Sequence, residues 1–384
     1  MQTVLTAARL VTSEEVIENP IVTIEDGLIA AIASRSQAEL PPGRHLDFAG
    51  STLVPAFFDV HMHGGAGYDL MEATPEAFHA VGHLLARNGV GAYLATTMTA
   101  PVESILKSLA GIAKFIGTSD HGARPLGIHM EGPFLSPHKR GCHPEDLLQT
   151  PTIELFDRMW QASEGNIRLM TIAPEMPNAP EVIAHAAALG VRSSLGHSNA
   201  VATEAQAGVR AGAVSATHTF NAMRDFSHRD PGILGEVLTN DHLFAELICD
   251  GFHVDPAAVQ IYWRCKGPGR AILVTDAMSA AGMPDGNYKL GTLDVRVIGG
   301  KCVLDERTLA GSTLTLNRGV KNFAEFTGAP IEQVARLATR NPAQMTGLES
   351  ETGNLAKGRP ADITVLSANN EVVETFLLGT PVAR

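Results

Sequence analysis

The 384-residue chain lacks the features of disulfide-stabilised, secreted and membrane-spanning proteins. Its four cysteines are too few and too scattered for a disulfide framework, and no CxxC motif occurs. The amino terminus shows no charged-then-apolar signal pattern. No apolar run approaches the ~18–20 residues that a membrane-spanning helix needs. We therefore expect a cytoplasmic protein with no membrane partner.

Basic charge is also scarce, with 29 Lys and Arg against 41 Asp and Glu and a net charge of −12. This balance argues against a nucleic-acid partner, because nucleic acids bind basic surfaces. No P-loop or GxGxxG motif is present, so a phosphate would have to be held by side chains and loop amides. A content of 45% hydrophobic and 18% charged residues is typical of a globular enzyme.

The pattern of strands and helices changes along the chain. Residues 1–53 and 346–384 contain short alternating runs broken by turns, which predict β-strands. Residues 54–345 alternate eight strand candidates with helical segments, apart from a two-stranded hairpin expected within residues 287–304. We predict an α/β fold, a (β/α)8 TIM-like barrel with a small β-sandwich domain built from both termini. Helices are expected at residues 75–87, 102–116, 316–327 and 331–339.

Five of the expected barrel strands end in residue types that bind divalent metals, where such a barrel keeps its active site. These residues are His61, His63, Glu131, His197, His218 and Asp276. His61 and His63 are two apart and point to the same face of a strand. Glu131 lies among apolar residues, where a buried charge needs a cation. With His197 and His218 it would form the three-ligand layout of a catalytic zinc site.

Some of these residues also have structural interpretations. His61 and His63 alone could be neutral imidazoles that hydrogen-bond within the barrel wall. Asp276 could cap a helix that follows its strand. Neither alternative accounts for metal-binding residue types at five strand ends.

The order of these residues resembles the N-acetylglucosamine-6-phosphate deacetylase family of the amidohydrolase superfamily. The similarity covers essentially the whole chain, and it is carried by HMHGGAGYD, HMEGPFLSPHKRGCHP, LGHSNA, ATHTFNAM, HRDPGILG, ICDGFHVD, LVTDAMSAAGMPDGNYKLG and LAGSTLTLNRGV. The resemblance implies hydrolysis of N-acetylglucosamine 6-phosphate to glucosamine 6-phosphate and acetate, in amino-sugar catabolism or cell-wall recycling.

The resemblance also implies a divalent metal cofactor, with one or two ions per subunit. Zinc is the first expectation, and iron, manganese and cobalt suit the same ligands. Some family members replace the first two histidines with amides and hold one ion. This sequence retains His61 and His63, so it resembles the members that hold two, with Glu131 bridging. Asp276 would carry the catalytic proton, and His143 would polarise the acetyl carbonyl or orient the sugar.

The family's substrate-binding positions carry over to a further set of residues. They are Cys142, His143, Asn221, Ala222, Arg229, Asp250, Gly251, Phe252, His253, Leu309, Ala310 and Gly311. In the family the arginine comes from the partner subunit, so a homodimer with Arg229 donated across the interface is implied. Without the resemblance, Arg229 would be interpreted as a turn residue and His143 as a solvated surface residue.

Residues 135–144 have few apolar anchors and are expected to form an exposed loop that closes over substrate. Cys142 in this loop is either a small residue with no special role or a thiol activated by the neighbouring Lys139, Arg140 and His143.

Other functions compete with the leading one. A deacetylase for the galactosamine isomer is compatible with the sequence, because the two sugars differ at one hydroxyl. A cyclic amidase of the superfamily typically carries a carboxylated lysine as its metal bridge, and Glu131 at that position disfavours it. A non-catalytic relative would have lost metal ligands, and this chain retains them all.

Overall fold

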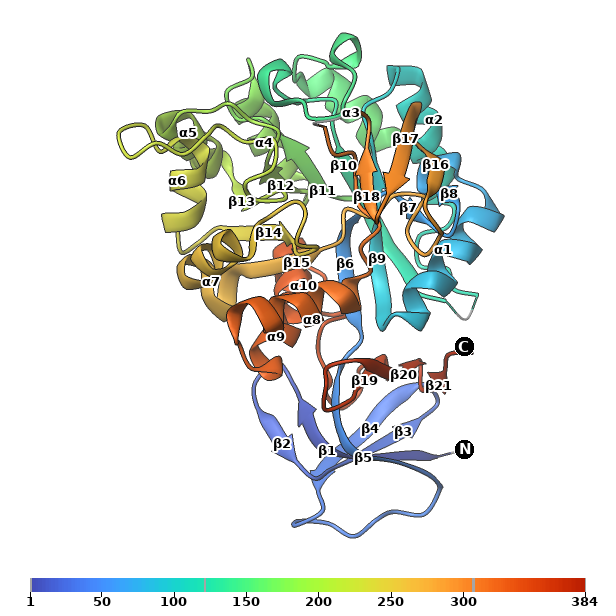
Figure 1. Cartoon of the computed structure of the whole chain (residues 1–384). Coiled ribbons are helices and arrows are strands. Elements are labelled where there is room, and N and C mark those ends of the chain that lie inside the picture. The colour runs from blue at the N-terminus through green and yellow to red at the C-terminus, as the bar shows by residue number, and fades with distance from the viewer. Residues whose placement is uncertain (1, 121, 306–307, 384) are drawn as a thin grey trace.

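The computed structural model describes residues 2–120, 122–305 and 308–383, and its larger part is a barrel of eight parallel strands (Figure 1). The strands follow one another around the barrel in chain order. They are β6 (Phe57–Met62), β9 (Val90–Thr97), β10 (Arg124–Glu131), β11 (Ile167–Ile172), β12 (Arg192–Leu195), β13 (Ala213–Ala216), β14 (Phe244–Ile248) and β15 (Ala271–Val274). The predicted barrel is therefore confirmed.

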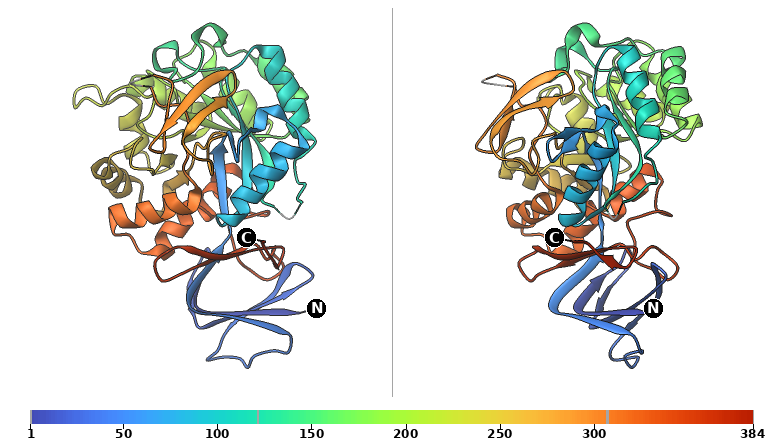
Figure 2. Two further views of the ribbon diagram at one scale, coloured as in Figure 1. Left: turned by 45° about the vertical axis from the view of Figure 1, so that its right-hand side comes forward. Right: turned by 90° about the vertical axis from the view of Figure 1, so that its right-hand side faces the viewer.

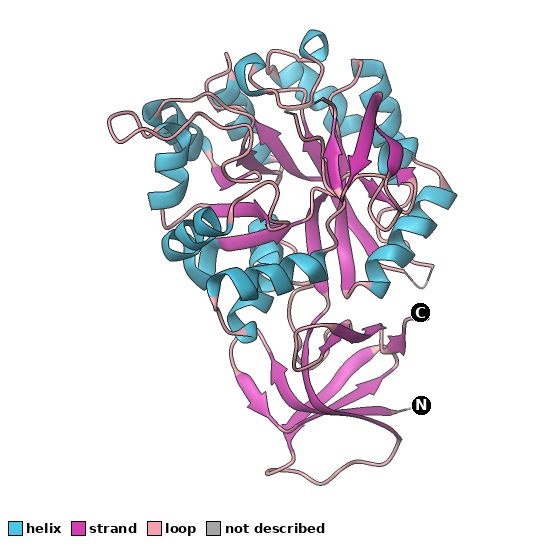
Figure 3. Cartoon of the chain, in the orientation of Figure 1, coloured by secondary structure: helices cyan, strands magenta, loops and turns pink. Residues whose placement is uncertain are grey.

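Helices cover the outside of the barrel, as Figure 3 shows. They are α1 (Pro75–Arg87), α2 (Val102–Ala113), α3 (Ile153–Ala162), α4 (Ala179–Ala188), α5 (Ala202–Ala211), α6 (Gly232–Thr239), α7 (Pro256–Arg270), α8 (Leu316–Thr327), α9 (Ile331–Leu337) and α10 (Arg340–Thr346). The predictions for α1 and α8 are correct to the residue. Helix α9 ends before residue 339 because Thr339 leaves the helical conformation and begins α10, which is an addition to the predicted helices.

The two faces of the barrel strands belong to two buried clusters, because successive strand side chains point to opposite faces. On β9, Tyr93 packs with helix residues such as Ile112, between the strands and the helical layer. Leu94, next to it, belongs to the second cluster with Phe58 and Ile272 of other strands. Both faces are therefore apolar, as expected for a parallel sheet covered by helices.

The first and last barrel strands meet through backbone hydrogen bonds. Asp276 N donates to His61 O at 2.8 Å, and His63 N donates to Ala277 O at 2.7 Å. Met62 and Ala277 form a parallel bridge between these donors and acceptors. The junction that closes the barrel therefore brings the His61–His63 pair next to Asp276.

The two ends of the chain form one eight-stranded sheet, which confirms the predicted small β domain. Strand β5 pairs in parallel with β1 and antiparallel with β19, so it joins the amino-terminal strands to the carboxyl-terminal ones. The sheet lies at the amino-terminal end of the barrel strands (Figure 2). Its strands are β1 (Thr3–Val11), β2 (Val16–Glu18), β3 (Pro20–Glu25), β4 (Leu28–Ser34), β5 (Arg44–Pro55), β19 (Ile363–Leu366), β20 (Val372–Leu377) and β21 (Thr380–Pro381).

The inserted segment after the barrel contains three antiparallel strands instead of the predicted two. They are β16 (Gly286–Leu290), β17 (Leu293–Ile298) and β18 (Lys301–Val303). The turn at Gly299 and Gly300 is correctly predicted, but a second turn at Gly291 divides the first predicted strand. Gly291 has a positive φ of 55°, which glycine adopts without steric cost. The insertion lies over the carboxyl end of the barrel (Figure 1).

Short elements complete the fold at the carboxyl end of the barrel. They are the strands β7 (Gly64–Gly65) and β8 (Tyr68–Asp69) and the 3₁₀ helices η1 (Leu70–Glu72), η2 (Pro137–Lys139) and η3 (Glu145–Leu147). All four cysteines are free thiols, as expected. In the part of the chain that the structure describes, no helix combines the length and apolarity that crossing a membrane requires.

Phe376 of β20 tests whether the two termini share one core. Its side chain is 1% exposed, lies in the cluster of the terminal sheet and meets the Phe48 ring edge-on, with centroids 5.8 Å apart. We expect Phe376→Ala to lower the free energy of unfolding by about 3–5 kcal/mol, measured by urea denaturation. The control Val373→Ala, at an exposed position of the same strand, should change it by roughly 0.5 kcal/mol or less. Equal effects of the two variants would contradict a shared core.

Candidate active site

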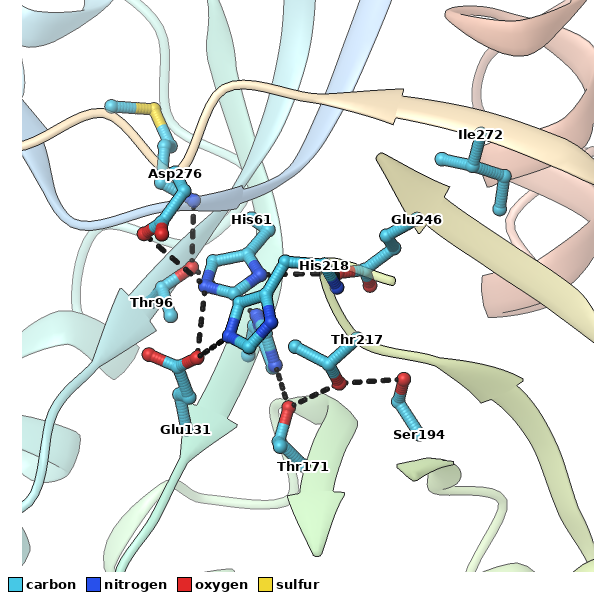
Figure 4. Close-up of polar contacts among 12 residues, drawn as sticks. His61, Thr96, Glu131, Thr171, Ser194, Thr217, His218, Glu246, Ile272 and Asp276 are labelled. Atoms are coloured by element: carbon cyan, nitrogen blue, oxygen red, sulfur yellow. Dashed lines mark hydrogen bonds and ion pairs between the residues drawn. The ribbon is translucent and has the colours of Figure 1, made fainter. Parts of the chain in front are cut away.

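The six predicted metal-binding residues lie together at the carboxyl end of the barrel. Figure 4 shows His61, Glu131, His218 and Asp276 among them. All six are buried. They are His61 within β6 and His63 just after it, Glu131 at the end of β10, His197 and His218 after β12 and β13, and Asp276 after β15.

The carboxylate of Glu131 is the centre of the site and faces five imidazoles. Its Oε1 lies 3.1–3.3 Å from three Nε2 atoms, those of His61, His197 and His218. Its Oε2 lies 3.1 Å from His63 Nε2 and 3.5 Å from that of His143.

Asp276, which follows the last barrel strand β15, faces the same centre. Its Oδ1 lies 3.2 Å from His63 Nε2 and 3.6 Å from His61 Nε2. Two groups of side chains therefore have the spacing of metal ligands. One comprises His61, His63 and Asp276, and the other comprises Glu131, His143 and His197.

The outer nitrogens of two imidazoles determine where their protons lie. His197 Nδ1 is 3.0 Å from the carbonyl oxygen of Lys139, and His61 Nδ1 is 3.1 Å from a carboxylate oxygen of Glu246. Both partners accept hydrogen bonds, so both Nδ1 atoms carry the proton. In a neutral imidazole the Nε2 atom then keeps its lone pair. When these two imidazoles are neutral, as metal ligands are, their Nε2 lone pairs therefore point at the centre of the site.

The positions of the imidazole nitrogens show whether these residues could bind a metal ion. His197 Nε2 and His218 Nε2 lie 2.9 Å apart, and both face the anionic Glu131 oxygen. His61 Nε2 is buried and has no hydrogen-bond partner among the described residues. Acceptors that face one another are stabilised by a cation between them. Imidazole and carboxylate ligands suit divalent transition metals, so the site fits such an ion.

The raised pKa values of His61 and His63 also indicate that positive charge is favourable in the site. Burial opposes protonation of His63, yet Asp276 and Glu131 raise its pKa to about 9. The same carboxylates raise the pKa of His61 well above its ordinary value, again against the effect of burial. Burial lowers the pKa of His197 to about 4, so this imidazole is neutral. The half of the site around His61 and His63 therefore attracts cations, and His197 offers a free lone pair.

Three of these residues adopt left-handed backbone conformations that non-glycine residues rarely use. The φ angles are 47° at His197, 27° at His218 and 49° at Asp276. Such conformations cost on the order of 1–3 kcal/mol each and persist where the surrounding structure holds them. Each lies two positions beyond the end of its strand, where the chain turns and the side chain faces the centre.

A pocket of about 350 Å³ adjoins this centre. Most of the residues predicted for the site line it. They are His63, Glu131, Cys142, His143, His197, His218, Asn221, Ala222, His253, Asp276, Leu309 and Gly311. Five further residues that were not predicted line the pocket: Met98, Gly141, Ile248, Leu290 and Thr308. Their residue types occur throughout the chain, so nothing in the sequence distinguishes them as site residues.

Some predicted substrate-binding residues do not line this pocket: Asp250, Gly251, Phe252 and Ala310. The Asp250 carboxylate instead holds a pocket residue in place, because Oδ2 accepts from His253 Nδ1 at 2.7 Å and Oδ1 accepts from the His253 amide at 2.8 Å. The Phe252 side chain is 46% exposed, and Ala310 is fully buried between two lining residues. In this structure Asp250 therefore orients His253.

Arg229 lies away from the pocket of its own chain. It is exposed on the loop between β13 and α6, which projects from the molecule (Figure 1). The outer part of this loop is closed by an ion pair between Arg224 Nη2 and Asp230 Oδ2 at 2.5 Å. Phe226 at the tip is 60% exposed. The loop thus presents a cation and an aromatic ring outward.

The loop of residues 135–144 is tied to the site. Its His143 is buried and its Nδ1 is 2.8 Å from Thr99 Oγ1, so it is not the solvated histidine that its loop position suggests. Burial, with Glu131 and Asp276 nearby, raises the pKa of Cys142 well above its ordinary value. Burial is the larger cause and the two carboxylates add to it, so the structure favours the interpretation of Cys142 as a small residue with no special role.

Two further buried groups, behind the predicted metal ligands, were not predicted from the sequence. Glu246 contacts His61, and His129 Nε2 contacts Thr171 Oγ1. Figure 4 shows the hydrogen-bonded hydroxyls of Thr171 and Thr217 and the contact between His61 and Glu246. Both lie in apolar strands, in FAELI and GIHME. A charged or polar residue in such a run is the signal that could have identified them, as it did for Glu131.

Comparison with known proteins gives consistent results over the whole chain. The model of the amidohydrolase family matches residues 52–382. The chain is 37% identical to N-acetylgalactosamine-6-phosphate deacetylase of Escherichia coli O157:H7, over 99% of both chains. It is 35% identical to N-acetylglucosamine-6-phosphate deacetylase of Bacillus subtilis (strain 168), over 96% of this chain and 94% of that one.

Solved structures resemble it equally closely. A mutant of N-acetyl-D-glucosamine-6-phosphate deacetylase from Mycobacterium smegmatis, in complex with N-acetyl-D-glucosamine-6-phosphate, superposes with a TM-score of 0.92 at 34% identity over 100% of both chains. The N-acetylglucosamine-6-phosphate deacetylase of Thermotoga maritima gives a TM-score of 0.88 at 32% identity over 98% of both chains.

The central position of Glu131 makes it the residue on which metal retention should depend most. We expect Glu131→Gln to lose most of its bound metal after dialysis, because the amide removes the negative charge that faces every imidazole of the site. Elemental analysis of the purified protein measures this. Glu145→Gln, which changes an exposed glutamate of η3, should keep the wild-type content. Wild-type metal content in Glu131→Gln would show that any ion lies elsewhere.

Proposed function

The chain belongs to the amidohydrolase family, and we propose that it hydrolyses N-acetylglucosamine 6-phosphate to glucosamine 6-phosphate and acetate in amino-sugar metabolism. The observation that carries this proposal is the carboxylate of Glu131 among five imidazoles, with Asp276 beside it and a pocket of about 350 Å³ in front. The similarity to whole deacetylase chains supports the choice of substrate.

A divalent ion held by these residues would polarise the amide carbonyl and lower the pKa of a water molecule. Glu131, His197 and His218 would hold one ion, and His61, His63 and Asp276, together with Glu131, would hold a second. Zinc is the first candidate for both, with iron, manganese or cobalt as alternatives.

Asp276 is the group assigned to proton transfer. Its side chain is 12% exposed at the pocket wall, so it can contact a substrate amide while Oδ1 stays near His63. It would accept the proton of the attacking water and deliver it to the sugar nitrogen as the C–N bond breaks. His143 faces the same space from the loop of residues 135–144, where it can donate a hydrogen bond to the acetyl oxygen or the sugar.

The phosphosugar would be held by the rest of the pocket. His253, oriented by Asp250, lines it together with Asn221 and with the backbone at Leu309. Asp250 raises the pKa of His253 against the effect of burial, which favours an imidazolium that could face an anion. We propose that Arg229 completes the phosphate site of a partner subunit in a homodimer, since its loop projects away from its own pocket.

N-acetylgalactosamine 6-phosphate is a second candidate substrate. The observation in its favour is the 37% identity to the deacetylase that is named for that sugar. Acetate release from both 6-phosphates distinguishes the candidates, with both unphosphorylated sugars as controls. The proposal expects faster release from N-acetylglucosamine 6-phosphate. Faster release from its galactosamine isomer would replace the proposed substrate, and release from neither would refute deacetylation.

Asp276→Asn should lower turnover by roughly 10²–10⁴-fold or more, because an amide cannot accept and return a proton. Asparagine tolerates the left-handed conformation of this position, so the fold should be kept. Turnover and the melting temperature measure the two effects. Asp255→Asn, at the exposed N-cap of α7, is the control and should retain activity. Wild-type turnover of Asp276→Asn would rule out its catalytic role.

Arg229→Ala should raise the KM for the 6-phosphate by roughly 10- to 150-fold, which corresponds to about 1.5–3 kcal/mol for a hydrogen bond to a charged group. Activity on unphosphorylated N-acetylglucosamine should hardly change. Arg210→Ala, an exposed arginine of α5, is the matched control.

Donation across a dimer is tested by mixing Arg229→Ala and Asp276→Asn subunits. One site of each heterodimer would then contain both intact residues and should regain activity. Verified heterodimers without activity would exclude donation by the partner subunit.

A further inference from the structure

Glu246 is a fully buried carboxylate that the proposed reaction does not use. It lies in β14, in the otherwise apolar run FAELI, and its side chain has no exposed surface. A buried charge is costly unless it is paired or hydrogen-bonded. The contacts of Glu246 therefore need an explanation beyond packing.

Both contacts of this carboxylate are with residues of the metal-binding centre. Oε2 lies 3.1 Å from His61 Nδ1 and accepts a longer bond, 3.3 Å, from the backbone amide of His218 (Figure 4). Oε1 has no hydrogen-bond partner among the described residues. The main polar interaction of Glu246 is thus with the imidazole of His61.

That interaction determines which nitrogen of His61 faces the site. The carboxylate accepts a hydrogen bond, so the proton of His61 is placed on Nδ1 and the lone pair on Nε2, which lies 3.3 Å from Glu131 Oε1 and 3.6 Å from Asp276 Oδ1. Carboxylates in this position orient metal-binding histidines and increase their basicity.

The His61 ring is also held from a second direction. The His129 ring packs edge-on against it, with centroids 4.5 Å apart and an interplanar angle of 89°. His129 is itself anchored, because its Nε2 lies 2.8 Å from Thr171 Oγ1. By contrast, His63 Nδ1 has no hydrogen-bond partner among the described residues. His61 is therefore the oriented member of the His61–His63 pair.

We propose that Glu246 is a positioning residue that makes the His61, His63 and Asp276 group able to hold a second divalent ion. It fixes the tautomer and the ring orientation of His61, while Glu131, His197 and His218 hold the other ion without contact between Glu246 and their side chains. This inference rests on the proposed metal centre. According to this inference, Glu246 determines whether the centre holds one ion or two.

Zn²⁺ titration of the metal-depleted protein by calorimetry tests the proposal. Glu246→Leu should weaken the second ion by about 10- to 100-fold and leave the first within about threefold. Glu246→Gln should weaken it less, because the amide oxygen still accepts from His61 Nδ1. The double variant His61→Asn, His63→Gln is the reference for a chain with one ion. The control is Glu236→Gln on α6, where the wild-type carboxylate accepts a hydrogen bond from Asn240; this variant should bind as the wild type does.

The possible outcomes separate this inference from the metal centre itself. Two ions in the wild type and an unchanged second dissociation constant in Glu246→Leu would overturn the role of Glu246 alone. Equal weakening of both ions in both Glu246 variants, with lowered melting temperatures, would indicate a purely structural residue and also overturn it. No bound ion in the wild type would refute the metal centre and the inference together. Rescue by glutamine relative to leucine supports it.

Discussion

The rest of the site depends on one electrostatic constraint, the buried carboxylate of Glu131. Five imidazoles face its two oxygens, and the lone pairs of at least two of them point toward it. Such an arrangement of acceptors is unfavourable in a buried space without positive charge. Protons can supply that charge, as the raised pKa of His63 indicates, and divalent ions supply more of it. The chemistry of the protein follows from this requirement.

The backbone of the barrel places the side chains around Glu131. The hydrogen bond from Asp276 N to His61 O closes the barrel and at the same time places two of the side chains around the centre. Left-handed conformations at His197, His218 and Asp276 turn their side chains toward Glu131 immediately after each strand ends. The stability of the barrel therefore offsets the local strain of the site, as is common at functional centres.

The barrel and the six central residues could be predicted because strand ends in a (β/α)8 fold meet at one place. Glu131 was identifiable as a charge in an apolar run, but Glu246 has the same signal and was missed. Sequence does not show which strand residues face the site and which support it. For a related reason, the sequence leaves two interpretations of Cys142 open. Its chain neighbours, such as Arg140, are basic, whereas folding places it near Asp276.

Anomalous diffraction from crystals of the metal-depleted protein reloaded with zinc, collected on both sides of the zinc absorption edge, tests the central claim most directly. The account predicts one peak among Glu131, His197 and His218, and a second beside His61, with both peaks within bonding distance of the shared carboxylate. Full metal loading with no peak near Glu131 would contradict it. The positive charge at the centre would then come from protonated imidazoles, and the proposed metal-dependent chemistry would not apply.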